Sequence, residues 1–211
     1  MAANYKIKEC FYTLQGEGAQ AGRAAVFLRF TGCNLWSGRE EDRQGAVCKF
    51  CDTDFIGIDG TNGGRYTQVQ CADLVQSLWP GGGQPYVVCT GGEPLLQLDE
   101  PLIAELQSRG FEVAVETNGT LPVPESIDWV CVSPKANADL VVASGNELKL
   151  VYPQNEVGAQ PQLFTQLSFD HFFLQPKDEA GQDHVPAAVA YCMAHPEWRI
   201  SLQTHKLMGI E

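Results

Sequence analysis

The sequence predicts an α/β fold, a partial (βα) barrel whose middle helices are truncated. Short apolar runs recur along the chain and suit a parallel sheet that is covered on both faces. Segments with helical spacing separate several of these runs, so that strands and helices alternate. We expect strands at residues 24–30, 86–89, 111–116, 129–132, 147–151, 171–174 and 199–203.

Helices are expected between some of these strands. Residues 67–79 have apolar side chains at helical spacing, and residues 99–108 carry a proline in what would be the first turn. Helical patterns return at residues 160–167 and 186–194. Residues 117–128 are too few for a complete crossover helix and contain two prolines, so the middle of the barrel is expected to lack full helices.

Length and composition favour a single domain. The 211 residues are enough for one domain that buries about 70% of its unfolded surface. The chain is 44% hydrophobic and 19% charged, without repeats or low-complexity tracts, which predicts a packed core. We therefore expect one domain over residues 1–211.

Charge and hydropathy disfavour two classes of partner. The chain has 14 Lys and Arg against 26 Asp and Glu, a formal net charge of -12, and it lacks the basic stripe that binds nucleic-acid phosphates. Its apolar runs are strand-sized, far from the roughly 20 residues that span a bilayer. The first residues lack the apolar segment of a secretory signal. We expect no nucleic-acid partner, no membrane partner and a cytoplasmic location.

Eight cysteines in a chain of this size and composition do not predict a disulfide scaffold. Cys89 and Cys131 lie inside apolar strands, where a free cysteine acts as a small hydrophobe, and both are expected in the core. Cys33, Cys48 and Cys51 depart from that pattern because they follow the first of the expected strands as a group.

Three thiolates in one loop can hold a cubane iron-sulfur cluster and leave one iron open to a ligand. The pair Cys48 and Cys51 forms a CxxC, which also serves zinc and redox chemistry. A structural zinc needs a fourth protein ligand, and the one nearby candidate, Cys71, lies on an expected helix. The iron-sulfur cluster is therefore favoured over zinc or a redox CxxC.

Two segments resemble the cluster loop of the radical S-adenosylmethionine (SAM) superfamily: Gly32-Cys33-Asn34-Leu35, and Cys48-Lys49-Phe50-Cys51 followed by Asp52-Thr53. The resemblance implies a partial barrel of the radical SAM type, with a 4Fe-4S cluster on the three cysteines and SAM bound to it. The usual loop has three residues between the first two cysteines, and this one has fourteen. The longer loop costs only about 1.3 kcal/mol, against a metal-thiolate binding energy of roughly 10 kcal/mol or more. Within the extended cluster loop of residues 33–51, residues 36–45 are either a solvated excursion or a surface for a redox partner.

The segment Thr90-Gly91-Gly92-Glu93-Pro94 follows the second apolar strand and resembles the SAM-binding motif of the same superfamily. Its glycines allow close backbone approach to a ligand, and Glu93 offers acceptor oxygens to an amine such as that of SAM. In isolation the motif indicates only a tight strand-to-helix turn, and Lys135 could be a solvated lysine. By resemblance, SAM contacts come from Phe50, Asp52, Gly92, Glu93, Ser133, Pro134, Lys135, Gln175 and Pro176.

Residues 11–18 and 203–207, together with Arg29 and Asp52-Thr53, resemble the 7-carboxy-7-deazaguanine synthase family, and the likeness covers the chain nearly end to end. It implies the radical SAM-dependent ring contraction of 6-carboxy-5,6,7,8-tetrahydropterin to 7-carboxy-7-deazaguanine with loss of ammonia, in queuosine biosynthesis. SAM would be a cofactor in this reaction. The resemblance also implies a homodimer and an electron donor such as flavodoxin or ferredoxin.

The expected substrate has a flat donor and acceptor edge and a carboxylate. Gln15, the Gly16 backbone and Glu17 suit the edge, and Arg29 suits the acid. Without the resemblance, Arg29 would be a surface cation, Glu17 a turn cap and His205 a core histidine. By resemblance, an N-terminal substrate-binding segment and later positions supply the contacts: Leu14, Gln15, Gly16, Glu17, Arg29, Thr90, His205 and Glu211.

Thr53 directly follows the CxxC, and its hydroxyl is the kind of hard oxygen that Mg²⁺ prefers. The resemblance implies that this residue binds a Mg²⁺ that also contacts the substrate. The alternative is a turn threonine that bonds to its own backbone.

Two other functions stay open. A glycyl-radical activating enzyme would share the cluster and the glycine-rich motif but would need a surface that docks a protein. A non-catalytic iron-sulfur or zinc module would leave the glycine-rich motif and Ser133-Pro134-Lys135 without a role.

Overall fold

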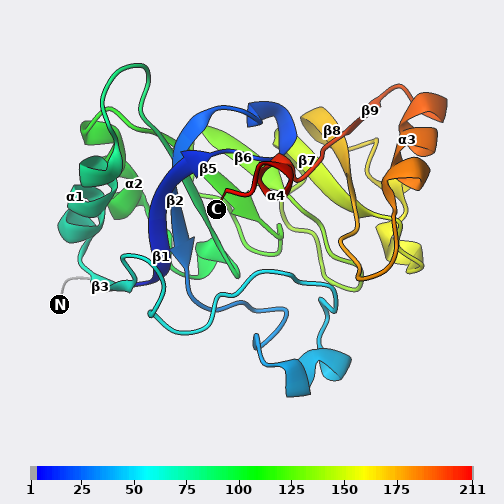
Figure 1. Cartoon of the computed structure of the whole chain (residues 1–211), viewed down its shortest axis with the longest axis horizontal. Helices are drawn as coiled ribbons and strands as arrows, with labels where there is room; N and C mark the ends of the chain where they lie inside the picture. The colour runs from blue at the N-terminus through cyan, green and yellow to red at the C-terminus, as the bar shows by residue number, and fades with distance from the viewer. Residues whose placement is uncertain (1–3, 211) are drawn as a thin grey trace.

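A computed structural model describes residues 4–210, which form a curved sheet with strand order β3-β1-β2-β4-β5-β6-β7-β8-β9 (Figure 1). From β2 through β4 to β9 every neighbouring pair is parallel, whereas β1 pairs antiparallel with both β2 and β3. The strands are β1 (Tyr5–Leu14), β2 (Ala24–Phe30), β3 (Gly64–Tyr66), β4 (Tyr86–Gly91), β5 (Glu112–Thr117), β6 (Trp129–Val132), β7 (Ser144–Tyr152), β8 (Ser168–Pro176) and β9 (Trp198–Ile200).

The helices lie mostly at the two ends of this sheet. Figure 1 shows α1 and α2 together at the N-terminal end and α3 at the opposite end, while the short α4 crosses the middle. The helices are α1 (Gln68–Leu78), α2 (Glu100–Ser108), α3 (Val185–Ala194) and α4 (Thr204–Met208), with 3₁₀ turns η1 (Gly18–Gln20), η2 (Glu40–Gly45), η3 (Pro94–Leu96), η4 (Val157–Ala159) and η5 (Pro161–Leu163).

Local sequence explains where the first two helices begin. Thr67 and Gln70 form a reciprocal capping box at the start of α1. Asp99 caps α2 by accepting from the Leu102 amide, and the same carboxylate oxygen accepts from the Tyr5 hydroxyl. The expected truncation of the middle helices is confirmed, because within the described residues the connections β5–β6 and β6–β7 contain no helix.

Two sequence-based expectations need correction, and two strands, β1 and β3, are additional to those expected. Residues 160–167 form 3₁₀ turns and not an α-helix, because β8 begins directly after them and leaves no room for regular helical turns. Residues 199–203 are a strand only as far as Ile200, since Gln203 already caps α4. The strand β1 was missed because its register shifts between Ile7 and Glu9, which breaks the apolar alternation.

Strand alternation separates the core from the concave side of the sheet. On β2, Val26, Leu28 and Phe30 lie in the core cluster under α1 and α2, so that the intervening Phe27 and Arg29 face a cavity on the other side.

Cys89 and Cys131 are buried as expected, and burial raises the pKa of each thiol well above its ordinary value. Among residues 4–210, no helix has the length and apolar character needed to cross a membrane.

Candidate active site

One cavity of about 420 Å³ opens where the parallel strands end. It is lined by the ends of β4, β5 and β8 and by the segments that follow β2, β6 and β9, which is where βα folds carry their chemistry. The predicted site residues that line it are Leu14, Gln15, Gly16, Glu17, Arg29, Cys33, Cys48, Phe50, Cys51, Asp52, Thr53, Thr90, Gly92, Ser133, Lys135, Gln175, Pro176 and His205.

Three predicted residues are not part of this lining. Glu93 and Pro134 lie behind it, and Glu211 falls outside the described residues. The Glu93 side chain is fully buried, and its carboxylate accepts from the Leu95 and Asn118 amides and from the Thr117 hydroxyl. Burial raises the pKa of Glu93, although these hydrogen bonds favour the ionised form.

The three cysteines of the cluster loop line the cavity as free thiols. Burial raises the pKa of Cys33 and of Cys48, so thiolates would form there as metal binds. Among residues 4–210, no three Cys, His, Asp or Glu side chains are close enough to hold a single metal ion. Three thiolates are a donor set that a 4Fe-4S cluster can use while one iron stays open to another ligand, so the chemistry of these residues fits the cluster that the sequence predicts.

The glycine-rich motif supports the start of the cluster loop. A side chain at Gly92 would place its Cβ 2.2 Å from the carbonyl oxygen of Gly32, so only glycine fits. The Glu93 amide donates to the same Gly32 oxygen at 2.9 Å. Gly92 is therefore required for packing against the backbone just before Cys33, whereas the expected close approach to a ligand stays a prediction.

Polar groups at the ends of β5 and β6 complete this half of the site. Lys135 donates through Nζ to the carbonyl and the hydroxyl of Ser133, both at 2.7 Å, so it is held at the cavity rather than freely solvated. Asn118 donates to Asn34 at 3.0 Å and thereby ties the cluster loop to the end of β5.

A buried ion-pair network forms another part of the cavity wall. Lys149 on β7 is 4% exposed, and its Nζ lies 2.5 Å from Glu17 and 3.5 Å from Glu116. Burial by itself lowers the pKa of Lys149, but these carboxylates outweigh it and hold that pKa well above the ordinary value. Burial by itself raises the pKa of Glu17, but Lys149 lowers it below the ordinary value. Both groups are therefore charged at neutral pH.

Amide side chains orient these carboxylates. Gln15 donates to Glu116 at 2.9 Å, and Gln203 and Gln175 donate to Glu17 at 3.0 and 3.2 Å. Glu17 accordingly joins three elements and does not merely cap a turn. With two carboxylates around one ammonium, this wall presents acceptor oxygens, which suit a ligand edge rich in N–H donors.

Two further predicted substrate contacts have defined partners. Arg29 donates through Nε to Glu9 at 2.7 Å across the β1–β2 pair, while its terminal nitrogens make no hydrogen bond to residues 4–210. His205 is half-buried beside the cavity, not enclosed in the core, and its ring lies so close to Gly16 that any Cβ there would be 2.2 Å from Nδ1.

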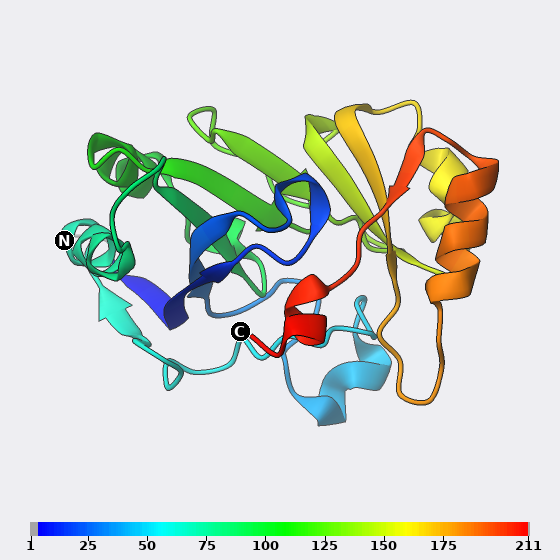
Figure 2. The same cartoon turned by 45° about the horizontal axis from the view of Figure 1, so that its top comes forward.

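Thr53 lines the cavity, and its hydroxyl makes no hydrogen bond to residues 4–210. The hydrogen bond to the local backbone that a turn-forming threonine would make is therefore not seen in the described residues. Next to it, Asp52 accepts from Lys206 of α4 at 2.7 Å, and Lys206 also contacts Asp178 at 2.6 Å. Burial by itself raises the pKa of Asp52, but the Lys206 hydrogen bond outweighs it and lowers that pKa. Figure 2 shows α4 beside the cluster-loop segment, as this contact requires.

Sequence reasoning missed Lys149 and Lys206. Lys149 could have been found, since Glu147 and Lys149 are charged residues of one face within an otherwise apolar strand. Lys206 gave no such signal, because a lysine on a short polar helix is ordinarily a solvated residue.

The fold and the three-cysteine cavity define a radical SAM protein, and the Radical SAM superfamily model matches residues 43–141. The chain is 58% identical to 7-carboxy-7-deazaguanine synthase of Caulobacter vibrioides and 60% identical to that of Bordetella pertussis, each over 98% of this chain and 99% of the relative. The chain belongs to the 7-carboxy-7-deazaguanine synthase family. The crystal structure of QueE from Escherichia coli has a TM-score of 0.72 to this fold at 27% identity, covering 94% of this chain and 93% of that one.

Proposed function

We propose that this protein catalyses the radical SAM-dependent ring contraction of 6-carboxy-5,6,7,8-tetrahydropterin to 7-carboxy-7-deazaguanine, with release of ammonia, in queuosine biosynthesis. The observation that carries the proposal is the single cavity that joins the three cysteines to an acceptor-rich wall and to Arg29. Cys33, Cys48 and Cys51 would hold a 4Fe-4S cluster with one iron open to SAM, and together the cluster and SAM would supply the radical chemistry that the ring contraction needs.

The cofactor side would be held by the cluster loop and the strand ends. Cys33, Cys48 and Cys51 would bind the cluster. SAM would lie against Phe50, Asp52, Gly92, Glu93, Ser133, Pro134, Lys135, Gln175 and Pro176. The Glu93 carboxylate accepts three hydrogen bonds, which leaves roughly one of its four acceptor sites for the SAM amine. Because Glu93 is buried and does not line the cavity, that amine would have to reach behind the lining.

The substrate side would bind the pterin by both of its ends. Gln15, the Gly16 backbone and Glu17 would meet the donor and acceptor edge, with Leu14, Thr90 and His205 around the ring and Glu211 as a further contact. The terminal nitrogens of Arg29 would bind the carboxylate, because Nε is already held by Glu9. Thr53 would give its hydroxyl to a Mg²⁺ that also binds substrate oxygens.

A radical SAM enzyme needs a reductant for its cluster, and we propose flavodoxin or ferredoxin as the donor. We also propose a homodimer and a cytoplasmic location, in line with the family and the composition. Light scattering of the purified protein tests the homodimer, and reduction of the cluster by either donor tests the reductant.

The function is tested with anaerobically reconstituted protein, SAM and a chemical reductant, with the carboxylated pterin compared with the same pterin lacking the carboxylate. We expect the protein to bind SAM. We also expect it to form 7-carboxy-7-deazaguanine and ammonia from the carboxylated pterin and not from the pterin that lacks the carboxylate. Cluster-dependent SAM cleavage without either product would instead support the activating-enzyme alternative. Failure to bind SAM would support a non-catalytic module.

Arg29→Gln should raise KM for the carboxylated pterin by about tenfold, which corresponds to about 1.4 kcal/mol of lost binding. The matched control is Arg23→Gln, because Arg23 forms a bidentate pair with Glu112 at 2.9 and 2.6 Å but does not line the cavity. Equal KM increases in both variants would contradict the assignment of Arg29 to the carboxylate.

A further inference from the structure

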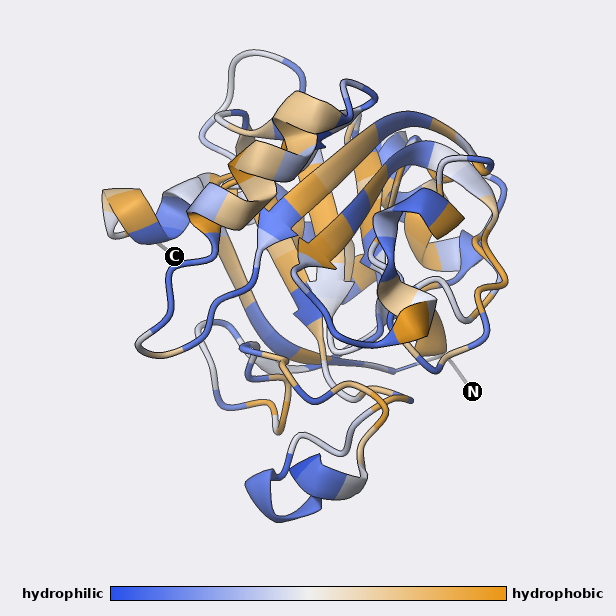
Figure 3. Ribbon diagram, turned by 90° about the vertical axis from the view of Figure 1, so that its right-hand side faces the viewer, coloured by the Kyte–Doolittle hydropathy of each residue, from blue (hydrophilic) through white to orange (hydrophobic). Residues whose placement is uncertain are grey.

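Arg43 lies in η2, on the insertion that lengthens the cluster loop, and it behaves unlike its charged neighbours. Figure 3 shows η2 as a hydrophilic turn that projects from the body of the protein. The side chains of Arg39 and Glu41 there are 69% and 75% exposed, whereas that of Arg43 is 26% exposed. The Arg43 side chain therefore folds back onto the protein.

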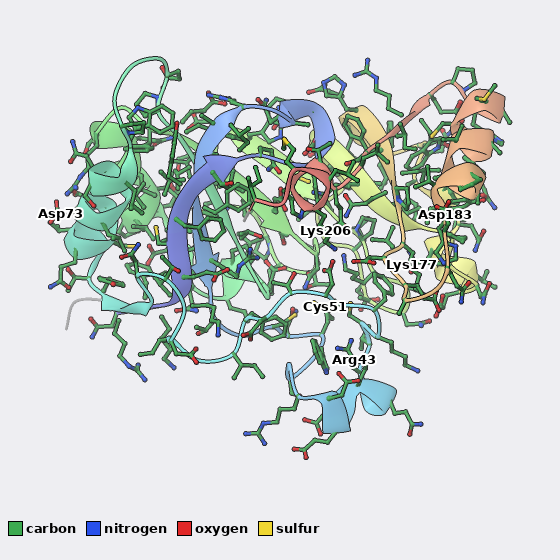
Figure 4. All side chains as sticks on the ribbon, in the orientation of Figure 1. Arg43, Cys51, Asp73, Lys177, Asp183 and Lys206 are labelled. Atoms are coloured by element: carbon green, nitrogen blue, oxygen red, sulfur yellow. The ribbon has the colours of Figure 1, made fainter. Side chains whose placement is uncertain are left out.

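The contacts of Arg43 lead to the CxxC segment. Its Nη1 donates to the carbonyl oxygens of Lys49 at 3.0 Å and of Cys51 at 3.2 Å. Its guanidinium carbon lies 4.0 Å from the centre of the Trp36 ring, and its Nε donates to Glu40. Figure 4 labels Arg43 and Cys51 and shows them near each other at the lower edge of the barrel.

Trp36 gives this arrangement a rigid base. The indole is 7% exposed, donates to the Arg39 carbonyl at 3.1 Å, and packs edge-on against Phe55 with ring centres 5.5 Å apart. Phe55 is 2% exposed, and its carbonyl accepts from the Gly32 amide. The Arg43 guanidinium is thus stacked on a platform that is fixed to the barrel at the start of the same loop.

The two ends of the CxxC segment are held in different ways. The Cys48 end is held by backbone, because the Val47 and Cys48 amides both donate to the Leu35 carbonyl. Within residues 4–210, the carbonyl of Cys51 accepts hydrogen bonds from Arg43 alone. Without that contact, the Cys51 end would be held mainly through its neighbour Asp52, whose carboxylate accepts from Lys206 in an exposed ion pair.

We propose that Arg43 is a positioning residue that fixes Cys51 relative to Cys33 and Cys48, so that the long insertion does not loosen the cluster. The inference rests on the proposed cluster. The insertion is then neither a merely solvated excursion nor only a candidate docking surface, because it carries the arginine that holds the cluster-binding residue Cys51 in place. A guanidinium suits this role, since it can stack on an indole and donate to two carbonyls at once.

The experiment measures how fast iron passes to a chelator from anaerobically reconstituted protein. Parent, Arg43→Gln, Arg43→Lys and the control Arg39→Gln are compared, and the thermal midpoint of each apo-protein is recorded. Arg39 shares the insertion, but its charged group makes only an exposed contact of 3.8 Å to Glu41. We expect Arg43→Gln to take up the cluster but to release iron about tenfold faster, a typical cost of losing a group that orients a metal ligand. Arg39→Gln should match the parent, and Arg43→Lys should be intermediate.

Each outcome decides the proposal. Unchanged release from Arg43→Gln, or equal acceleration in Arg39→Gln, overturns it. Faster release at an unchanged apo-protein midpoint supports it, whereas a purely structural role would lower that midpoint and leave the release rate as in the parent. If apo-Arg43→Gln does not fold, the Arg43→Lys rate decides in the same way. A parent protein that takes up no cluster overturns the proposed function itself, a result that is distinct from any difference among the variants.

Discussion

The two sides of the cavity are built by different means. The cofactor side consists of the cluster loop and several strand ends, joined by backbone and amide hydrogen bonds, and it carries three free thiols. The substrate side consists of charged and amide side chains from the segment after β1, from β7 and from the start of α4, already hydrogen-bonded to one another in the folded protein. A substitution on the cofactor side should abolish binding of the cluster or SAM and leave the fold intact. A substitution on the substrate side should also lower the stability of the protein.

The largest effect is expected on the cofactor side, from removal of a single cluster-binding cysteine. Cys33→Ala, Cys48→Ala and Cys51→Ala should each abolish the iron-sulfur cluster and with it SAM cleavage, because a cubane bound by two thiolates is exposed on two irons. The measurement is iron and sulfide per chain after anaerobic reconstitution. Cys89→Ala is the control: it should cost roughly 1 kcal/mol through a small core cavity while it keeps the cluster. A normal cluster in any of the first three variants would disprove the ligand assignment.

The second effect should appear on the substrate side as a loss of stability. Lys149→Met removes the cation between Glu17 and Glu116 and leaves these carboxylates with amide hydrogen bonds but without a counter-charge. We expect about 3 kcal/mol of destabilisation, the lower end for a broken buried pair, because Glu116 keeps 22% side-chain exposure. Denaturant unfolding measures the change. The cluster content should stay at the parent's level, and its loss would show that the two sides are not separable.

The same variant should reverse one pH dependence. In the parent, the pKa of Glu17 lies below its ordinary value, so its contribution to stability is present above about pH 4.3 and is lost as pH falls through the folded-state pKa. In Lys149→Met, burial is no longer opposed by the ammonium and raises the pKa of Glu17. Its contribution is then greatest at low pH and declines as pH rises. Unfolding free energies measured between acid and neutral pH should show this difference in slope.

What the sequence predicts differs between the two sides for a physical reason. Cys33, Gly92 and Ser133 sit in short motifs at strand ends, so spacing along the chain already places them, and the family resemblance adds their roles. Lys149 and Glu17 meet only because the sheet curves until β7 faces the segment after β1. Their pairing has no local signature, although Lys149 by itself stands out as a charged residue within an otherwise apolar strand. The contacts of Arg43 also have no signature in the sequence, because its partners are backbone carbonyls, which every residue has.

Thr53 lies at the border of the two sides and should give an intermediate effect. Thr53→Ala should bind SAM and hold the cluster normally, while KM for the carboxylated pterin rises about tenfold, because Mg²⁺ loses one oxygen but can keep waters and substrate oxygens. High Mg²⁺ should partly rescue turnover, and Thr53→Ser should be milder since it keeps the oxygen. Turnover independent of Mg²⁺ in the parent, or unchanged kinetics in Thr53→Ala, would show that Thr53 binds no metal.

The smallest effect is expected where α4 meets the cluster loop. Lys206 contacts Asp52 and Asp178, but the side chains of all three residues are 41% to 56% exposed, so water and salt screen the ion pairs. Lys206→Met should therefore destabilise the protein by at most about 1 kcal/mol, well below the loss in Lys149→Met. Because Lys206 lowers the pKa of Asp52, its contribution should be present above the ordinary aspartate pKa of about 3.9 and vanish as pH falls through the folded-state value. Denaturant unfolding of Lys206→Met at low and high salt is the measurement, with Lys149→Met in parallel. A loss as large as that of Lys149→Met, or one that salt does not reduce, would mean that α4 belongs to the buried substrate side and not to the exposed rim.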